Sequence, residues 1–472
     1  MNRRKFLETA AAMGGACLVK ACGTPASREQ PFSSEPPRET CERILHLSSA
    51  DETQVQVFRT RNSVTRFAEN SIHQNVTEGA GAAEVVLVVA GSVARVVTNR
   101  LDEVSIRSAL REGVERARRQ KPVPDFLSMP GPNAIRAVSR FDLATREASP
   151  EERAEAVSRT LAAALGASVT AAGLLETGST ETALANSRGL TAFHRETQAN
   201  FSLTVLSEDS SGWAQGAAYR LADLDVGGMT RRAIEKAQRA RRPGAADPGR
   251  YTVVLEPAAV ADLVTFLLPA FDARLVEERR SCFVGKLGQP VFGPNVTILD
   301  DVHDVRQSGA PFDGEGVAKR RLCLVEDGVL RTLVRDRATA RKTGAGATGH
   351  GSGPPEYGAR PSNVVFRGGT EIRDELIRGL ARGILITHFW YVRSNDPFRL
   401  TVTGMTRDGT FLIENGALTR GLRNMRFNVA VPEMLRGVEA MSPEESASGI
   451  ESPSGLYPAL RVRDFNFTSL AP

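Results

Sequence analysis

The sequence predicts an α+β protein with two folded domains: an N-terminal α/β domain over residues 42–245, with a meander sheet and amphipathic helices, and a β-rich C-terminal domain over residues 250–472. Three observations predict this class. A chain of 472 residues is too long for one hydrophobic core, and its 41% hydrophobic and 24% charged content is typical of globular proteins. In the first half, β-branched runs alternate with helical spacing. In the second half, strand-like runs are separated by tight-turn dipeptides.

The first residues indicate export. Residues 1–21 resemble a twin-arginine signal, because Arg3 and Arg4 precede an apolar stretch that is too short to span a bilayer. Residues 22–41 are rich in Pro and Ser and indicate an extended tether. The sequence before Cys22 resembles a lipoprotein box, so we expect a periplasmic or cell-envelope protein. It is either attached to the membrane only through a lipid on Cys22 or secreted without one.

The charge of the chain argues against a nucleic-acid partner. The formal net charge is +5, but the leader holds four basic residues against one acidic residue, so the remainder is close to neutral. The most basic run, residues 231–242, has a helical pattern. We interpret it as a solvated helix face and not as a phosphate-binding surface.

The N-terminal domain is predicted to combine short strands with three helices. Residues 55–100 give four or five short β-branched runs separated by Asn, Gly and Ser turns, and a later pair of strands turns at residues 186–189. Ser149 and Glu152 form a capping-box pattern at the start of a helix. Amphipathic helical spacing occurs at residues 102–120, 149–167 and 229–242.

The C-terminal domain is predicted to open with a buried helix over residues 253–275 and to continue mostly as β-hairpins. Apolar residues fall on one face of this helix, Pro257 suits its first turn, and Pro269 should end or kink it. Residues 342–363 form a Gly- and Pro-rich loop of a length that is usually functional or mobile. Asp-Gly and Asn-Gly dipeptides predict hairpin turns at residues 326–328, 407–409 and 414–416.

Motif spacing identifies no catalytic or metal site in this chain. No two of its six histidines lie within twenty residues of each other, which excludes a pair of histidine metal ligands one helical turn apart. None of the five cysteines forms a CxxC pair, and there is no GxSxG elbow or phosphate-binding loop. Asp313 and Glu315 stand two residues apart, where Gly314 and Gly316 favour a polar turn over an acid–base pair. We predict no resident cofactor or metal, and the catalytic residues stay unassigned.

Long stretches, in order along the chain, resemble the TldD/PmbA family of peptidases. They extend from about residue 50 to about residue 430, and their number and order identify the chain as a member of that family. The stretches are TRFAENSIHQN, ETGSTETALANSRGL, GKLGQPVFGPNVTILDD, SGAPFDGEGVAKRRLCLVEDGVL, DRATARKTGAGATGHG, GILITHFWYVRSNDPFRLTVTGMTRDGTFLIENGAL and RNMRFN.

Catalytic members of this family resemble zinc peptidases that carry HExxxH on a helix and a later cysteine ligand. That helix should precede GKLGQPVF, where residues 253–275 stand without a histidine, and no cysteine follows Cys323. The tail PALRVRDFNFTS also resembles the PmbA type. The resemblance implies a non-catalytic PmbA (TldE)-like subunit of a metallopeptidase complex that degrades or trims unstructured peptides. Zinc is then expected only in a catalytic TldD-like partner, and self-association is the alternative assembly.

An extended peptide is the expected substrate, which the chain would bind with its walls or at a sheet edge. His350, Asp313 and Glu315 are the candidate groove residues, and a solvated loop around His350 is the competing interpretation. Two other functions stay open at this point. One is an autonomous metallopeptidase or other hydrolase whose His, Asp and Glu residues converge in space. The other is an envelope protein that binds peptides without proteolysis.

Overall fold

The computed structural model describes residues 35–124, 126–353, 358–449 and 454–471. The predicted export signal with Arg3 and Arg4, the proposed lipidation site Cys22 and most of the tether lie outside these residues. No helix in the described ranges is long and apolar enough to cross a membrane.

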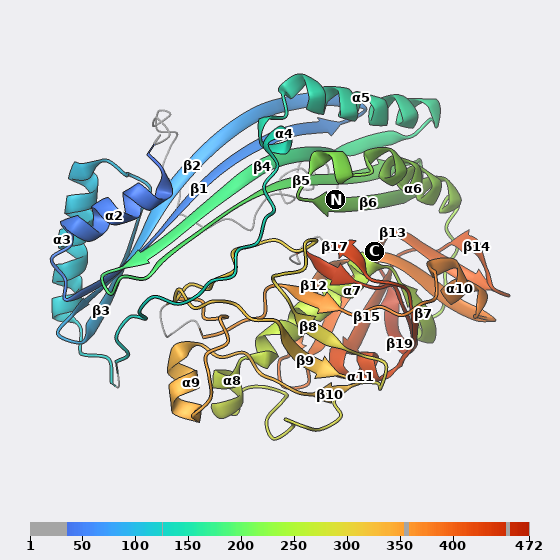
Figure 1. Ribbon diagram of the computed structural model, residues 1–472. Helices are drawn as coiled ribbons and strands as arrows, with labels where there is room; N and C mark the ends of the chain where they lie inside the picture. Colours follow the sequence, from blue (N-terminus) through green and yellow to red (C-terminus); the bar gives the residue numbers. More distant parts are fainter. Residues whose placement is uncertain (1–34, 125, 354–357, 450–453, 472) are drawn as a thin grey trace. The chain divides into compact units, whose positions relative to one another are not determined.

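A six-stranded antiparallel sheet in the order β3-β2-β1-β4-β5-β6 forms the first half of the described chain (Figure 1). Residues 55–100 contribute to three long strands, so the prediction of four or five short ones was wrong. Asn62 lies inside β1 and not in a turn, because it pairs with Glu78 of β2 on one side and with Gly178 of β4 on the other. The strands are β1 (Glu52–Ala68), β2 (Ser71–Val89), β3 (Ser92–Thr98), β4 (Thr170–Asn186), β5 (Thr191–Leu206) and β6 (Ser211–Ala218).

Helices pack on one face of this sheet at its two ends (Figure 1). Val55 and Phe67 lie an even number of residues apart on β1, so they point to the same face although they belong to two separate cores. The predicted capping box of Ser149 and Glu152 starts α5. The helices are α2 (Pro37–Leu47), α3 (Glu103–Arg119), α4 (Leu143–Glu147), α5 (Pro150–Gly166), η1 (Leu221–Asp223) and α6 (Val226–Arg239).

Two sheets form the β-rich second half, which completes the predicted α+β class. In the first sheet the pairing closes on itself, from β12 through β7, β19, β15 and β13 back to β12. The second has the order β10-β9-β8-β11-β18-β17. The strands of the first sheet are β7 (Gly249–Leu255), β12 (Arg382–Asp396), β13 (Thr401–Glu414), β14 (Ala417–Gly421), β15 (Met425–Ala430), β16 (Val438–Met441) and β19 (Leu460–Leu470). Those of the second are β8 (Ile298–Asp300), β9 (Leu322–Glu326), β10 (Val329–Leu330), β11 (Val364–Phe366), β17 (Glu445–Ala447) and β18 (Gly455–Tyr457).

The predicted long helix is a succession of three shorter ones that starts in the core between these sheets. α7 (Pro257–Val264) has Pro257 in its first turn and is followed by η2 (Thr265–Phe271), which contains Pro269, and by α8 (Ala273–Glu277). Pro269 cannot donate a backbone hydrogen bond, which accounts for the break in the α-helix. The predicted inward face is at most 1% exposed throughout: Val260, Leu263, Val264, Leu267, Leu268 and Phe271. The remaining helices are α9 (Arg337–Thr343), α10 (Arg373–Arg378) and α11 (Val431–Arg436).

Two of the three predicted hairpin turns are confirmed. The turns at residues 326–328 and 414–416 join β9 to β10 and β13 to β14, with positive φ at Asp327 and Asn415. The turn predicted at residues 407–409 was wrong, because these residues form an irregularity inside β13, opposite a register shift in β12. Asp408 and Gly409 do have positive φ. The conformation therefore bends a continuous strand where the dipeptide had suggested a reversal.

Candidate functional site

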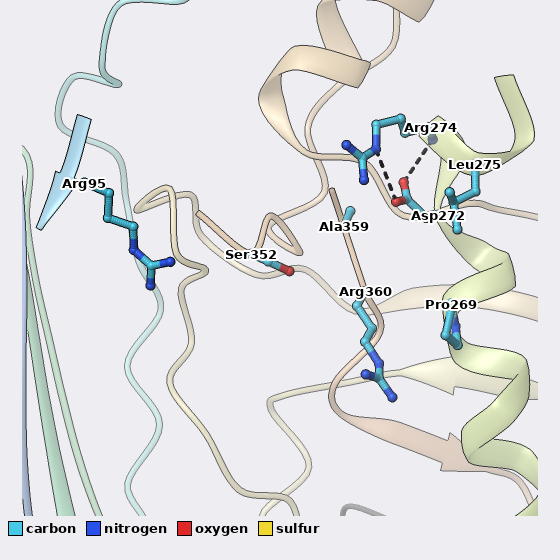
Figure 2. Close-up of a pocket in the computed structure, with 8 residues that line it drawn as sticks. All are labelled: Arg95, Pro269, Asp272, Arg274, Leu275, Ser352, Ala359 and Arg360. Carbon is cyan, nitrogen blue, oxygen red and sulfur yellow. Dashed lines mark hydrogen bonds and ion pairs between the residues drawn. The ribbon is translucent and has the colours of Figure 1, made fainter. Parts of the chain in front are cut away.

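An open pocket of about 600 Å³ lies where the α7–η2–α8 segment leaves the core (Figure 2). Pro269 of η2 and Leu275 of α8 give it an apolar wall, and Ser352 and Arg360 come from the Gly-rich loop. In Figure 2, Ser352 lies between Arg95 of β3 on one side and the α8 residues on the other. The lining residues are Arg95, Pro269, Asp272, Arg274, Leu275, Ser352, Ala359 and Arg360.

Asp272 fixes the pocket wall at the start of α8. Its carboxylate accepts a hydrogen bond from the backbone N–H of Arg274 at 2.9 Å and another from the N–H of Ala359. Burial raises the pKa of Asp272 above its ordinary value, although these two hydrogen bonds oppose the rise. Gly358 has φ +65°, and a Cβ there would stand 2.3 Å from Asp272 Oδ2, so the loop approaches this closely only because residue 358 is glycine.

The pocket is basic on balance, with three guanidinium groups against one carboxyl group. Arg95 forms an ion pair with Glu84, and Arg274 Nε lies 3.9 Å from Asp272 Oδ2. Within the described part of the chain, the Arg360 guanidinium has no hydrogen-bond or ion-pair partner. A small anionic group next to an apolar side chain is the ligand that such a lining suits.

The structure brings the three predicted groove residues together at the loop that also carries Ser352 and Arg360. His350 is 3% exposed and Asp313 is 5% exposed. Asp313 accepts from the backbone N–H groups of Glu315, Val317 and Gly351, and residues 313–316 form the polar turn that their glycines favoured. The residues are close neighbours, but they hold the loop and do not line the pocket. Their contact with a peptide stays a prediction.

His350 uses both of its ring nitrogens to hold the loop in place. Its Nε2 lies 3.0 Å from Asp300 Oδ1 and its Nδ1 lies 2.9 Å from the carbonyl oxygen of Thr348. Burial alone would raise the pKa of Asp300, but the hydrogen bond and charge of His350, together with the Lys319 charge and the Asn363 N–H, outweigh it and lower that pKa. Sequence reasoning missed Asp300, which stands 50 positions from His350 and in no recognisable spacing with it.

Glu315 joins this buried group to α9. Its carboxylate accepts from the backbone N–H of Arg337 at 2.9 Å and packs against Gly351, where a Cβ would stand 2.4 Å from Oε2. Burial, reinforced by the negative charge of Asp313, raises the pKa of Glu315 to about 8. The neutral form is therefore favoured at neutral pH, so that two carboxylates need not be charged side by side.

A second buried group contains Ser, His and Asp but lacks the geometry of a catalytic triad. Asp408 is in the middle, accepting from Ser211 Oγ at 2.6 Å and facing His388 Nε2 at 3.1 Å. His388 Nδ1 faces the carbonyl oxygen of Phe389 at 3.0 Å, so the imidazole has no nitrogen left to act as base for the serine. Nor do the described residues include any group of three or more His, Cys, Asp or Glu placed to hold a metal ion.

Two domain families match the chain and together cover most of it. The PmbA/TldA metallopeptidase central domain matches residues 144–241, and the PmbA/TldA metallopeptidase C-terminal domain matches residues 248–469. The second match includes the whole α7–η2–α8 segment and the loop that carries Arg360.

Individual relatives are distant. A metalloprotease of Methanothermobacter thermautotrophicus is 27% identical over 277 residues, which is 56% of this chain and 60% of that protein. Metalloprotease PmbA of Escherichia coli O157:H7 is 22% identical over 329 residues, 67% of this chain and 70% of that protein. An uncharacterized Methanocaldococcus jannaschii protein is 31% identical over 171 residues, 36% of this chain, and the chain spans only 40% of its length.

The fold is shared with solved structures over most of the chain. The crystal structure of TldE from Thermococcus kodakarensis superimposes with a TM-score of 0.84 at 21% identity, covering 91% of this chain and all of that one. At this identity the likeness shows the fold alone.

Proposed function

This chain belongs to the PmbA/TldD metallopeptidase family, and we propose that it is a non-catalytic, TldE-like subunit that binds extended peptides for a separate zinc-bearing subunit. The observation that carries the proposal is the α7–η2–α8 segment. It stands where the resemblance places the zinc-binding helix, but it contains no His or Cys and is packed into the core. A subunit of this kind would bind and orient substrate and would leave activation of water to its partner.

The histidines elsewhere in the described chain support this interpretation. His350 and His388 are buried, and both ring nitrogens of each lie within hydrogen-bond distance of partners inside the protein, so neither presents a ring nitrogen at the surface. Neither of these two histidines can therefore supply the accessible base or metal ligand that an autonomous hydrolase would need. We therefore favour the subunit over the hydrolase.

The pocket supports a role in peptide binding. It is accessible, it lies directly beside the α7–η2–α8 segment, and it combines guanidinium groups with an apolar wall. A relative named TldD homolog, from Haemophilus influenzae, is 33% identical over 148 residues, 30% of this chain and 30% of that protein. We propose a catalytic partner of that type.

Recovery of the partner tests the proposal. The full chain would be purified from its own host through a C-terminal tag, and the accompanying proteins would be identified by mass spectrometry. The expected result is a TldD-like chain with HExxxH, and cleavage of an unfolded casein substrate only when both chains are present. Cleavage by this chain alone, at the rate of the complex, would contradict the proposal.

Export is a further part of the proposal and needs its own test. We propose that residues 1–21 direct the folded protein through the twin-arginine route and that Cys22 then receives a lipid. Replacing Arg3 and Arg4 by lysine should retain the protein in the cytosol, as seen by fractionation. Mass spectrometry of the mature N-terminus should find a lipid-modified Cys22. A wild-type protein found only in the cytosol would rule out export.

A further inference from the structure

We propose that the pocket beside α8 binds the C-terminal carboxylate of an extended peptide, with Arg360 as the residue that pairs with it. This inference rests on the proposed function and adds to it a direction: the peptide would enter with its C-terminus against this subunit. Neither the ligand class nor the recognition residue follows from the family resemblance.

The charge pattern singles out Arg360 among the three arginines. Arg95 is already paired with Glu84, and Arg274 stands beside Asp272. Arg360 is exposed and has no hydrogen-bond or ion-pair partner in the described ranges, while its backbone N–H is fixed by the carbonyl oxygen of His350 at 3.0 Å. A planar guanidinium on a fixed backbone is suited to bidentate pairing with a carboxylate.

The rest of the lining suits the last residue of a peptide. Pro269 and Leu275 offer an apolar surface to its side chain, and the Ser352 hydroxyl can donate to its carboxylate or accept from its amide. The volume of about 600 Å³ lies inside the usual range for small-ligand sites, about 300–1,000 Å³. The site is thus large enough for a peptide end but too small for a folded domain.

The wall that carries Arg360 is held before any ligand arrives. Asp313 and Asp272 each accept backbone hydrogen bonds from this loop, at Gly351 and Ala359 respectively. Gly351 and Gly358 let the loop approach Glu315 and Asp272 more closely than any side chain would allow. Binding would therefore cost little ordering of the protein, which favours affinity.

A peptide amino terminus is a poorer occupant. Asp272 is the one carboxyl group in the lining, and it is buried and already accepts from two backbone N–H groups. An ammonium group would meet three guanidinium groups and compete with those hydrogen bonds. The carboxyl end is the end that this lining recognises.

A matched pair of peptides tests the proposal. The full-length chain would be titrated with two short unstructured peptides of identical sequence, labelled with fluorescein at the N-terminus and ending in leucine. One ends in a free carboxylate and the other in an amide. Affinity is read from fluorescence anisotropy. We expect the free acid to bind at least about tenfold more tightly, since a charged hydrogen-bonded pair is worth about 1.5–3 kcal/mol.

Variants locate the effect. Arg360→Ala should bind the acid as weakly as the amide and leave amide binding unchanged, while Arg360→Lys should keep part of the difference. Arg111→Ala, an exposed arginine of α3, serves as the matched control and should behave as wild type. Thermal unfolding of each variant checks that the exposed change leaves the fold intact.

The outcomes separate this inference from the proposed function. The inference is overturned if wild type binds the acid and the amide equally, or if the difference between them survives in Arg360→Ala. In both cases the proposal that the chain binds peptides is retained. Binding of neither peptide overturns both. Inorganic phosphate that displaces the acid more strongly than acetate does would show a general anion site and also overturn the inference.

Discussion

Two buried His–Asp pairs, built alike, serve different parts of the molecule. His350 pairs with Asp300 at 3.0 Å and His388 with Asp408 at 3.1 Å, and each histidine directs its other nitrogen at a backbone carbonyl. The first pair holds the loop that leads to the pocket. The second lies in β12 and β13 and reaches Ser211 of β6, so it joins the N-terminal sheet to the C-terminal half. The same chemistry positions a binding wall in one place and joins two sheets in the other.

Both pairs follow the same electrostatic rule. Burial favours the neutral form of Asp300 and of Asp408, but in each case the hydrogen bonds and nearby positive charges together, those of the histidine first, outweigh it and bring the pKa below its ordinary value. Removing either histidine leaves a buried carboxylate without its main partner, which is costly. Loss of His388 should nevertheless affect mainly stability, whereas loss of His350 should also affect peptide binding.

The largest expected effect is on stability, at the pair that joins the sheets. His388→Ala removes a fully buried ring that lies 4.4 Å from the Trp213 ring and leaves Asp408 with fewer partners. We expect the free energy of unfolding to fall by about 3–5 kcal/mol, measured by urea denaturation. His73→Ala, on an exposed strand position, is the control and should change it by less than about 0.5 kcal/mol. A loss of similar size in both variants would mean that burial of the pair is irrelevant.

His350→Ala should combine a smaller stability loss with a binding defect. We expect about 2–4 kcal/mol, since the ring is 3% exposed but Asp300 keeps its hydrogen bonds from the backbone N–H groups of Ser362 and Asn363. Because the loop carries Arg360, the variant should also lose selectivity for a peptide carboxylate, whereas His388→Ala, assayed where it is still folded, should keep it. An equal loss of carboxylate selectivity in His350→Ala and His388→Ala would contradict the different roles of the two pairs.

The pH dependence of stability should reveal Glu315. Its pKa of about 8 in the folded protein exceeds the ordinary carboxyl value, so the folded state binds more protons than the unfolded state between about pH 4.5 and pH 8. Stability that this proton contributes is present at low pH and is lost as the pH rises through that window.

Glu315→Gln, which keeps an acceptor for Arg337 N–H, should flatten this fall and stabilise the protein by about 1–2 kcal/mol near pH 8. Glu277→Gln, at an exposed position, should follow wild type. Parallel pH curves for wild type and Glu315→Gln would contradict the assignment.

The smallest stability effect is expected at Arg360. Arg360→Ala should change the free energy of unfolding by less than about 0.5 kcal/mol, because the side chain is exposed and unpaired within the described chain. Differential scanning calorimetry checks this. A larger loss would mean that the guanidinium supports the loop, and its role in peptide selectivity would then have to be measured with Arg360→Lys.

Local patterns predicted the elements that depend on local chemistry. The capping box at Ser149, the buried face of the α7–η2–α8 segment and the Asn415-Gly416 hairpin all follow from neighbours in sequence. The length of the N-terminal strands could not be predicted in this way, because Asn62 takes its conformation from the strands that pair with it on both sides. The contacts of Asp408 could not be predicted either, since its partners Ser211 and His388 come from distant strands.

The candidate site could be anticipated only in part. His350, Asp313 and Glu315 are indeed neighbours, but none of them lines the pocket. The residues that line it come from β3, from η2, from the start of α8 and from the loop after α9, and meet only through tertiary packing. No spacing in the sequence relates Arg95, Arg274 and Arg360, so the basic lining could not be read from it.

The most direct test of the central claim is the metal content of the purified chain. The protein would be dialysed without chelator and its zinc and other transition metals measured by atomic emission. A non-catalytic subunit predicts less than about a tenth of an equivalent, because catalytic and structural sites hold their metal tightly. About one equivalent would show that distant side chains do form a metal site, and would contradict the assignment of catalysis to a separate partner.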